Sequence, residues 1–368
     1  MIYFLGRYLH PQFEIFSYLR LVEYLSSRAI GAALTAILLT LFLTPVLIRY
    51  LHRHGLVDQR RDTGVVTSAD KAGTPVMGGA IFAGCVLVSC LLWCNLANLY
   101  LLIVLLGMVW FGTIGLFDDL TKMRARSGDH GLSESKKLLW QAVFALVVVF
   151  LLISPISPLP PDQAGAFYVP FLKAPLFNSL WLYMPIVFFF ILVVGNSVNI
   201  TDGLDGLAIV PSVFVLGVLG IFGWILGNAI WARYLNYHPL PGAGELAVFC
   251  SAFVGAGIGF LYFNSYPAQV FMGDTGALAI GGCMGTLSVV LKQEALFLIL
   301  GGLFVAEAVT SQIQDKIGIR WLGRRIFLRA PLHHQMQYKG LAETKVVIRL
   351  WIVAGILALT ALATLKLR

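Results

Sequence analysis

Five aspartates follow or interrupt long apolar segments, a position where carboxylates are rare. They are Asp118, Asp119, Asp202, Asp205 and Asp274. Acids beside such segments favour a functional role because hydrocarbon tolerates charge poorly. Carboxylates with amides, waters and phosphates are the usual environment of Mg²⁺, and nearby basic residues would hold a polyphosphate. The set therefore predicts metal-assisted phosphoryl transfer at a membrane surface.

Asp118 and Asp119 end the apolar run from Leu99 to Phe117, and Lys122 follows in a basic loop. Neighbours on a helix point about 100° apart, so we expect different roles for the two acids. One would bind a metal or orient a cation while the other handles a proton. The structural alternative is a pair of interfacial anions neutralised by the loop.

The segment from Asn196 to Gly206 is polar between apolar neighbours and contains no basic residue. Asp202 and Asp205 would share one face if this segment were helical. An EF-hand is excluded because the ladder of acids and the distal glutamate are missing. With Asn196 and Asn199 beside the acids, we expect a functional site rather than a structural turn.

Two further polar segments stand where apolar helices are expected to begin. In the first, Lys71, Thr74 and small residues suit a phosphate at a helix N-terminus. A plain helix entry with a packed Gly78–Gly79 face fits that segment equally well. In the second, Asp274 could be a helix cap or a ligand. Phe271 could stack on a planar base or anchor the interface.

His333 and His334 lie in the last basic loop. Paired histidines in such a loop can bind phosphate, metal or a proton, although the pair alone is weak evidence for zinc. Glu307 lies between alanines inside an apolar run. We expect it to be a partnered group within its helix, tied to a kink near Thr310 and Ser311.

The composition is typical of a membrane protein. The 368 residues are 58% hydrophobic and 12% charged, with a mean hydropathy of +0.84, whereas soluble domains are about half apolar and about a quarter charged. We expect one all-α polytopic domain over residues 1–368. The net charge of +8 then reflects topology and anionic ligands rather than nucleic acid. The five cysteines lie in apolar segments and are expected to be core residues.

Ten membrane helices are expected, since about 20 apolar residues cross a bilayer. Most of the 26 lysines and arginines lie in one alternate set of loops. The positive-inside rule places this set, and with it the active site, on the cytoplasmic side, and both termini in the periplasm. The expected helix cores are 29–48, 76–94, 99–117, 138–154, 180–198, 204–226, 246–263, 277–291, 295–313 and 346–364.

Over nearly its whole length the chain resembles the polyprenyl-phosphate N-acetylhexosamine-1-phosphate transferases. The resemblance is carried by five motifs in family order: Gly73-Thr74-Pro75 with Met77-Gly78-Gly79, Phe117-Asp118-Asp119, Asn199-Ile200-Thr201-Asp202-Gly203-Leu204-Asp205-Gly206-Leu207, Pro267-Ala268-Gln269-Val270-Phe271-Met272-Gly273-Asp274 and Ala330-Pro331-Leu332-His333-His334. The last loop is closest to the family members that use a muramoyl-pentapeptide nucleotide.

The resemblance implies a Mg²⁺-dependent enzyme with ten membrane helices in the bacterial inner membrane, often a homodimer. It would transfer phospho-N-acetylmuramoyl-pentapeptide from UDP-N-acetylmuramoyl-pentapeptide to undecaprenyl phosphate, a membrane lipid, and give lipid I and UMP. One alternative is a family member that uses UDP-N-acetylglucosamine. Another is a secondary transporter, which would place acids at the membrane midplane.

The resemblance also implies roles for single residues. Asp274 would be a catalytic metal ligand. Asp118 would deprotonate or orient the lipid phosphate, with Asp119 beside it as a further catalytic residue. Phe271 would stack on uridine, while Lys122 and His334 would contact the diphosphate. The full set of implied substrate-binding residues is Lys71, Thr74, Lys122, Asn196, Asn199, Asp202, Asp205, Asn264, Phe271, His333 and His334.

The chain departs from the family in its histidine motif. The family has three consecutive histidines and, two residues on, a glutamate, whereas this chain has Gln335 and Gln337 at the last two of these positions. Glutamine forms hydrogen bonds, but it carries no charge and does not titrate near neutral pH. We therefore expect the core chemistry to depend on the carboxylates and the metal.

Overall fold

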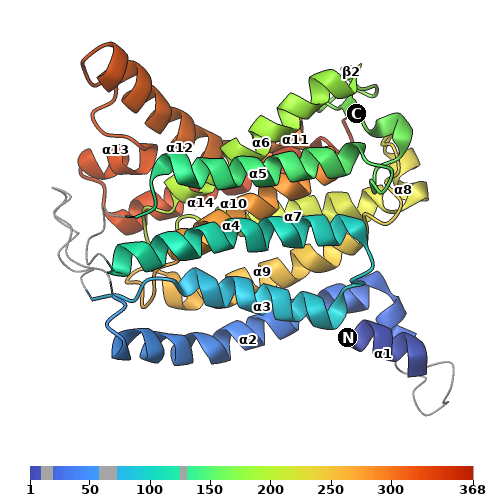
Figure 1. The fold of residues 1–368 in the computed structure, drawn as a ribbon, viewed down its shortest axis with the longest axis horizontal. Helices are drawn as coiled ribbons and strands as arrows, with labels where there is room; N and C mark the ends of the chain where they lie inside the picture. The colour runs from blue at the N-terminus through green and yellow to red at the C-terminus, as the bar shows by residue number, and fades with distance from the viewer. Residues whose placement is uncertain (10–19, 58–72, 125–130, 368) are drawn as a thin grey trace.

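Long helices packed side by side make up most of the molecule (Figure 1). The computed structural model describes residues 1–9, 20–57, 73–124 and 131–367, and Lys71 lies outside them. The helices are α1 (Ile2–Leu9), α2 (Leu25–Arg53), α3 (Gly78–Trp93), α4 (Leu99–Arg124), α5 (Glu134–Ile153), α6 (Leu180–Thr201), α7 (Ile209–Leu226), α8 (Ala229–Tyr234), α9 (Glu245–Asn264), α10 (Gly273–Val290), α11 (Glu294–Leu300), α12 (Gly302–Gln312), α13 (Leu332–Tyr338) and α14 (Glu343–Ala363).

Four further elements lie between these helices. A 3₁₀ turn covers Pro161–Gln163, and a π-helix, Ile313–Trp321, continues α12. The strands β1 (Ala166–Phe167) and β2 (Phe177–Asn178) pair antiparallel between α5 and α6, with Ala166 opposite Asn178.

Seven of the described helices are long and apolar enough to cross a membrane, namely α2, α4, α5, α6, α7, α9 and α14. The bent pair of α11 and α12, with its π-helical extension, makes an eighth if it counts as one span. Large apolar side chains such as Phe42, Phe150 and Leu359 stand exposed on the outer helices. A surface of this kind is suited to lipid, so the chain is a multi-pass, all-α membrane protein.

We predicted one continuous helix over residues 295–313, and this prediction is wrong. The segment is broken at Gly301, where α11 and α12 are bent by 85°. The bend lies before Glu307 rather than near Thr310 and Ser311, where we expected a kink. Gly301 follows an apolar turn and precedes a second glycine, and such pairs allow sharp changes of direction.

The other predicted segments coincide with helices whose ends differ by a few residues. The largest difference is at 99–117, where α4 continues to Arg124. At 204–226, α7 begins only at Ile209 because residues 202–208 form consecutive turns. The five cysteines are buried and unpaired, as expected. The total of ten spans stays a prediction, since neither α3 nor α10 is among the seven helices or the bent pair.

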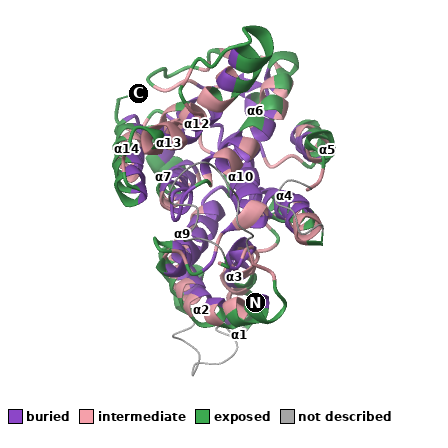
Figure 2. Ribbon diagram, turned by 90° about the vertical axis from the view of Figure 1, so that its left-hand side faces the viewer, coloured by how far each residue is buried: buried purple, intermediate pink, exposed green. Residues whose placement is uncertain are grey.

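Helix α10 is enclosed by its neighbours, and every residue from Thr275 to Val290 is buried. It packs against α3, α4 and α6 and lies near the centre in Figure 2. A Cβ added to Gly79 on α3 would lie 2.2 Å from the Cα of Gly276 on α10. Membrane helices approach this closely only where small residues meet.

Both chain termini lie at one end of the bundle, on the right in Figure 1. The opposite end gathers the last turns of α4 and α6 with the first turns of α3, α5 and α10. The acids singled out in the sequence therefore share one end of the molecule. That this end faces the cytoplasm is still a prediction.

Candidate active site

Asp118 and Asp274 face each other where α4 ends and α10 begins. Lys122 Nζ lies 2.7 Å from Asp118 Oδ2 and 2.8 Å from Asp274 Oδ2. Lys137 Nζ, from the first turn of α5, lies 2.7 Å and 3.1 Å from the same two oxygens. Two carboxylates far apart in the sequence thus share two ammonium groups, which compensates their charge in a largely buried position.

Small residues allow this close approach. A Cβ at Gly115 on α4 would lie 2.2 Å from the carbonyl oxygen of Asp274, so only glycine permits α4 and α10 to touch here. A Cβ at Gly131 would lie 2.4 Å from Asp118 Oδ1. The next backbone N–H, that of Leu132, donates to Asp118 Oδ1 at 2.7 Å. Asp118 is therefore held from both sides.

Asp119 has different partners from Asp118, in line with their different directions on the helix. Its Oδ1 accepts the backbone N–H of Asp274 at 3.1 Å. Its Oδ2 accepts the backbone N–H and the hydroxyl of Thr275 at 2.9 Å and 2.6 Å. Gly273 has a φ of +74°, and a Cβ there would lie 2.8 Å from Asp119 Oδ2. Asp119 therefore caps α10 and fixes the position of Asp274.

Asp118, Asp119 and Asp274 form a group that could hold a metal ion. Each places one carboxylate oxygen within 4.8 Å of the other two. Three oxygen donors suit a hard cation such as Mg²⁺. Asp119 already accepts three hydrogen bonds, and Asp118 accepts the N–H of Leu132 and contacts both ammonium groups, so Asp274 offers the most available oxygens of the group. Lys122 and Lys137 lie beside these oxygens, where they could also meet phosphate oxygens.

Lys137 is a site residue that we did not single out from the sequence. It was counted only among the basic loop residues. One signal was present, because Lys136 and Lys137 begin an apolar helix. Cations are unfavourable in the first turn, where the helix dipole is positive. A carboxylate partner explains why a lysine is tolerated there.

A second polar cluster connects the α6–α7 turns to the segment that precedes α10. Asn264 Oδ1 accepts the backbone N–H of Gly206 at 3.2 Å, and its Nδ2 donates to the carbonyl of Val270 at 2.9 Å. Asp205 Oδ2 accepts the backbone N–H of Ala268 at 3.1 Å. Through these hydrogen bonds to the backbone, Asn264 and Asp205 link the motif that contains Gly206 to the motif that contains Ala268 and Val270.

Asp202 ends α6 and is half-buried beside this cluster. Burial raises the pKa of Asp202 to about 7, and the neighbouring carboxylates of Asp274, Asp119 and Asp205 act in the same direction. Its side chain therefore belongs to the same electrostatic group as the first cluster. Asp202 and Asp205 lie in turns rather than on one helical face.

The start of α3 matches the packed alternative that the sequence left open. The backbone N–H of Gly78 donates to the carbonyl of Phe271 at 2.8 Å, and that of Gly79 to Met272 at 2.8 Å. These amides are occupied by carbonyls and are not available to a phosphate. Thr74 is half-buried in the segment just before them.

The remaining predicted residues fall into two groups. Asn199 and Phe271 are half-buried near the second cluster. Asn196, in contrast, lies inside α6 and pairs with Gln141 of α5 through Nδ2 and Oε1 at 2.7 Å. Its observed contact joins two helices, and a contact with substrate stays a prediction.

The two histidines have separate partners. His333 is buried, and its Nδ1 lies 3.0 Å from Glu307 Oε2. His334 Nδ1 lies 3.0 Å from Gln337 Oε1, so the glutamine at this position still supplies an oxygen. Burial and the neighbouring His333 lower the pKa of His334. Glu307 is thus the partnered acid that we expected, although its partner lies on another element.

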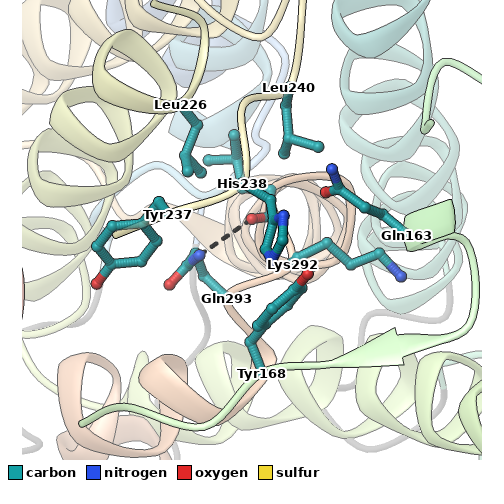
Figure 3. A pocket seen from close by; sticks show the side chains of 9 residues that line it. Gln163, Tyr168, Leu226, Tyr237, His238, Leu240, Lys292 and Gln293 are labelled. Carbon is teal, nitrogen blue, oxygen red and sulfur yellow. Dashed lines mark hydrogen bonds between the residues drawn. The ribbon is translucent and has the colours of Figure 1, made fainter. Parts of the chain in front are cut away.

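A small cavity lies at the opposite end of the bundle (Figure 3). Lys292 stands beside it with Nζ donating to the carbonyls of Ala164 at 2.9 Å and Ala166 at 3.2 Å. The lining offers amides, phenols, an imidazole and an amine rather than carboxylates, so it does not fit metal-assisted phosphoryl transfer. It is formed by Gln163, Tyr168, Leu226, Tyr237, His238, Leu240, Leu291, Lys292 and Gln293.

A comparison with known protein families gives a match that includes the cluster. The family model described as glycosyl transferase family 4 matches residues 101–292, just over half of the chain. The matched region runs from α4 to the end of α10 and includes all five singled-out aspartates. It ends before Glu307 and the two histidines.

Proposed function

Since the chain belongs to glycosyl transferase family 4, which includes the polyprenyl-phosphate hexosamine-1-phosphate transferases, we propose that it transfers phospho-N-acetylmuramoyl-pentapeptide from UDP-N-acetylmuramoyl-pentapeptide to undecaprenyl phosphate. The products would be lipid I and UMP. The observation that carries this proposal is the Asp118–Asp274 pair with its two shared lysines, at the end of a membrane-type helix.

In the proposed reaction, an oxygen of the lipid phosphate attacks the β-phosphorus of the nucleotide sugar. The bond from that phosphorus to the oxygen that bridges to the α-phosphate breaks, and UMP leaves with that oxygen. Such reactions depend mainly on positioning and on stabilising the charge of the phosphoryl oxygens. Bound Mg²⁺ would supply part of that stabilisation, with Asp274 as its main ligand.

Lys122 and Lys137 would supply the remaining stabilisation of the charge on the phosphoryl oxygens. Their ammonium groups are fixed by two carboxylates, so they need little reorganisation as charge develops. Asp118 would orient the lipid phosphate or accept its proton. Its carboxylate is buried and held by the N–H of Leu132, which suits a fixed role.

The nucleoside would bind at the second cluster. Phe271 would stack on uracil, with Lys71, Asn199 and Asp202 around it. The half-buried positions of Phe271, Asn199 and Asp202 leave part of each side chain accessible to a ligand. Asn264 and Asp205 would shape this site through the backbone groups that they bind.

We further propose that the protein lies in the bacterial inner membrane as a homodimer, with the carboxylate cluster on the cytoplasmic side. The family resemblance and the loop charges support this placement. Transport is a weaker hypothesis, because Asp118, Asp202 and Asp274 lie at helix ends rather than at mid-span.

A second candidate substrate is UDP-N-acetylglucosamine. The observation that favours it is the altered histidine motif, with Gln335 and Gln337 in place of histidine and glutamate. The two reactions use the same carboxylates and differ in the sugar. The structure of the cluster therefore fits both.

The deciding experiment measures UMP released by the purified protein with undecaprenyl phosphate and Mg²⁺. The two nucleotide sugars are compared as donors, with a reaction lacking lipid acceptor as the control. Release with the muramoyl-pentapeptide donor alone supports the proposal. Release with UDP-N-acetylglucosamine alone assigns the second candidate. Release from neither, in protein that is folded, contradicts both.

A further inference from the structure

Glu307 is a buried acid for which the proposed reaction has no use so far. It lies on α12, six residues after the break at Gly301, and its side chain is fully buried. Glu307 Oε1 accepts the backbone N–H of His333 at 3.2 Å, and Oε2 lies 3.0 Å from His333 Nδ1. One carboxylate therefore fixes both the backbone and the ring of His333.

The other ring nitrogen of His333 points toward the second cluster. A Cβ added to Gly203 would lie 2.4 Å from His333 Nε2, so this nitrogen lies against the turn that follows Asp202. Nε2 is buried, and no group among the described residues forms a hydrogen bond with it. A buried polar atom without a partner costs free energy and often marks the place of a ligand.

The contact with Glu307 selects the state of the ring. A carboxylate accepts hydrogen bonds only, so Nδ1 must carry the proton that is shared with Glu307. A diphosphate oxygen is also an acceptor, so its contact with Nε2 needs a second proton on that nitrogen, in the imidazolium form in which both ring nitrogens donate. Carboxylate–histidine pairs of this kind orient a ring for a second partner at metal sites. Here the second partner would be an anion.

We propose that Glu307 is a positioning residue that directs His333 Nε2 toward a diphosphate oxygen of the nucleotide. This inference rests on the proposed function and deepens it by adding one ring nitrogen of His333 to the diphosphate contacts expected of Lys122 and His334. Gly203 lies next to Asp202, whose carboxylate is in the electrostatic group of Asp274. A diphosphate between the uridine site and the Asp118–Asp274 pair would therefore pass this turn.

The test compares the binding of UDP and of uridine to the full-length protein by calorimetry. Uridine lacks the diphosphate, so it reports on the nucleoside site alone. Glu307→Gln keeps an acceptor oxygen for the backbone of His333 and removes the charge. We expect it to weaken UDP binding about tenfold and to change uridine binding less than twofold.

His333→Asn gives an independent variant. The asparagine amide can replace Nδ1 at Glu307, but nothing replaces Nε2. UDP binding should weaken about tenfold again, and the double variant should be no weaker than either single one because the two residues act as a unit. Glu294→Gln is the matched control. Glu294 is also a buried acid of the bent pair, but it lies at the other end and accepts the hydroxyl of Tyr183.

The outcomes are distinct. An equal loss of UDP and uridine binding in both variants would mean that Glu307 only stabilises the fold, and the inference would be wrong. Unchanged UDP binding in both would also refute it while the proposed function stands. If the unaltered protein binds neither UDP nor uridine, the proposed function fails together with the inference.

Discussion

Replacing Lys137 with methionine tests whether the lysine pair stabilises charge in the reaction. Methionine keeps much of the length of the side chain and removes the ammonium, which lies 2.7 Å from Asp118 and 3.1 Å from Asp274. Loss of one fixed charge donor at a developing anion typically lowers kcat about 100-fold to 1,000-fold. Lys122 stays at the same two oxygens, so we expect the lower value, about 100-fold or about 2.7 kcal/mol.

The assay is UMP release at saturating nucleotide sugar and lipid phosphate over a range of Mg²⁺ concentrations. The effect should fall on kcat more than on KM, because the charge that Lys137 meets develops in the transition state. The apparent Mg²⁺ affinity should not fall, since a cation near the carboxylates has been removed. Lys136→Met is the matched control, as Lys136 is the exposed neighbour in the same turn.

Two results would refute the reasoning. Activity of Lys137→Met within threefold of the unaltered protein at every Mg²⁺ concentration would show that the second lysine is dispensable. An equal loss in Lys136→Met would indicate a general effect of positive charge at the start of α5. The melting temperature of each variant establishes that it is folded.

Four further outcomes are expected. Asp274→Asn should abolish Mg²⁺-dependent UMP release, and near-normal activity would remove Asp274 as a metal ligand. Phe271→Ala should raise KM for the nucleotide by at most about tenfold, as expected for a lost aromatic stack; an unchanged KM would place the base elsewhere. Burial lowers the pKa of His334. Gln337→Glu should raise it, because a carboxylate would replace the amide oxygen beside the ring, and NMR titration of the ring measures this shift. Burial lowers the pKa of Lys292 to about 7, so between about pH 7 and 10.5 the unfolded chain binds more protons than the folded chain. The free energy of unfolding should therefore rise with pH over that window. Chemical denaturation of Lys292→Met should show a smaller rise.

The sequence predicts a feature of the structure well where a single local pattern, such as a long apolar run, is enough to determine it. The run from Leu99 to Phe117 can only be a membrane-type helix, and it forms most of α4. The acids at helix ends were assigned to one side of the membrane from loop charge, and they do share one end of the bundle. The different directions of Asp118 and Asp119 follow from helical geometry, and the two have different partners.

What the sequence did not predict depends on packing between distant segments. The pairing of Asp118 with Asp274 requires the contact at Gly115, which no local pattern reveals. The role of Lys137 was hidden because a lysine in a basic loop has a simpler explanation. The partner of Glu307 lies on α13, beyond the range of helical spacing.

The chemistry of the site is fixed chiefly by the backbone of one helix. The first turn of α10 carries Asp274, and it is restrained on two sides by contacts that involve no substrate. Asp119 binds its first amides, and Gly115 allows its carbonyl to rest on α4. Functional groups held on packed helices are positioned more accurately than groups on loops. Asp119 therefore contributes to the site by holding Asp274 opposite Asp118, and its effect on catalysis should pass through the geometry of that pair.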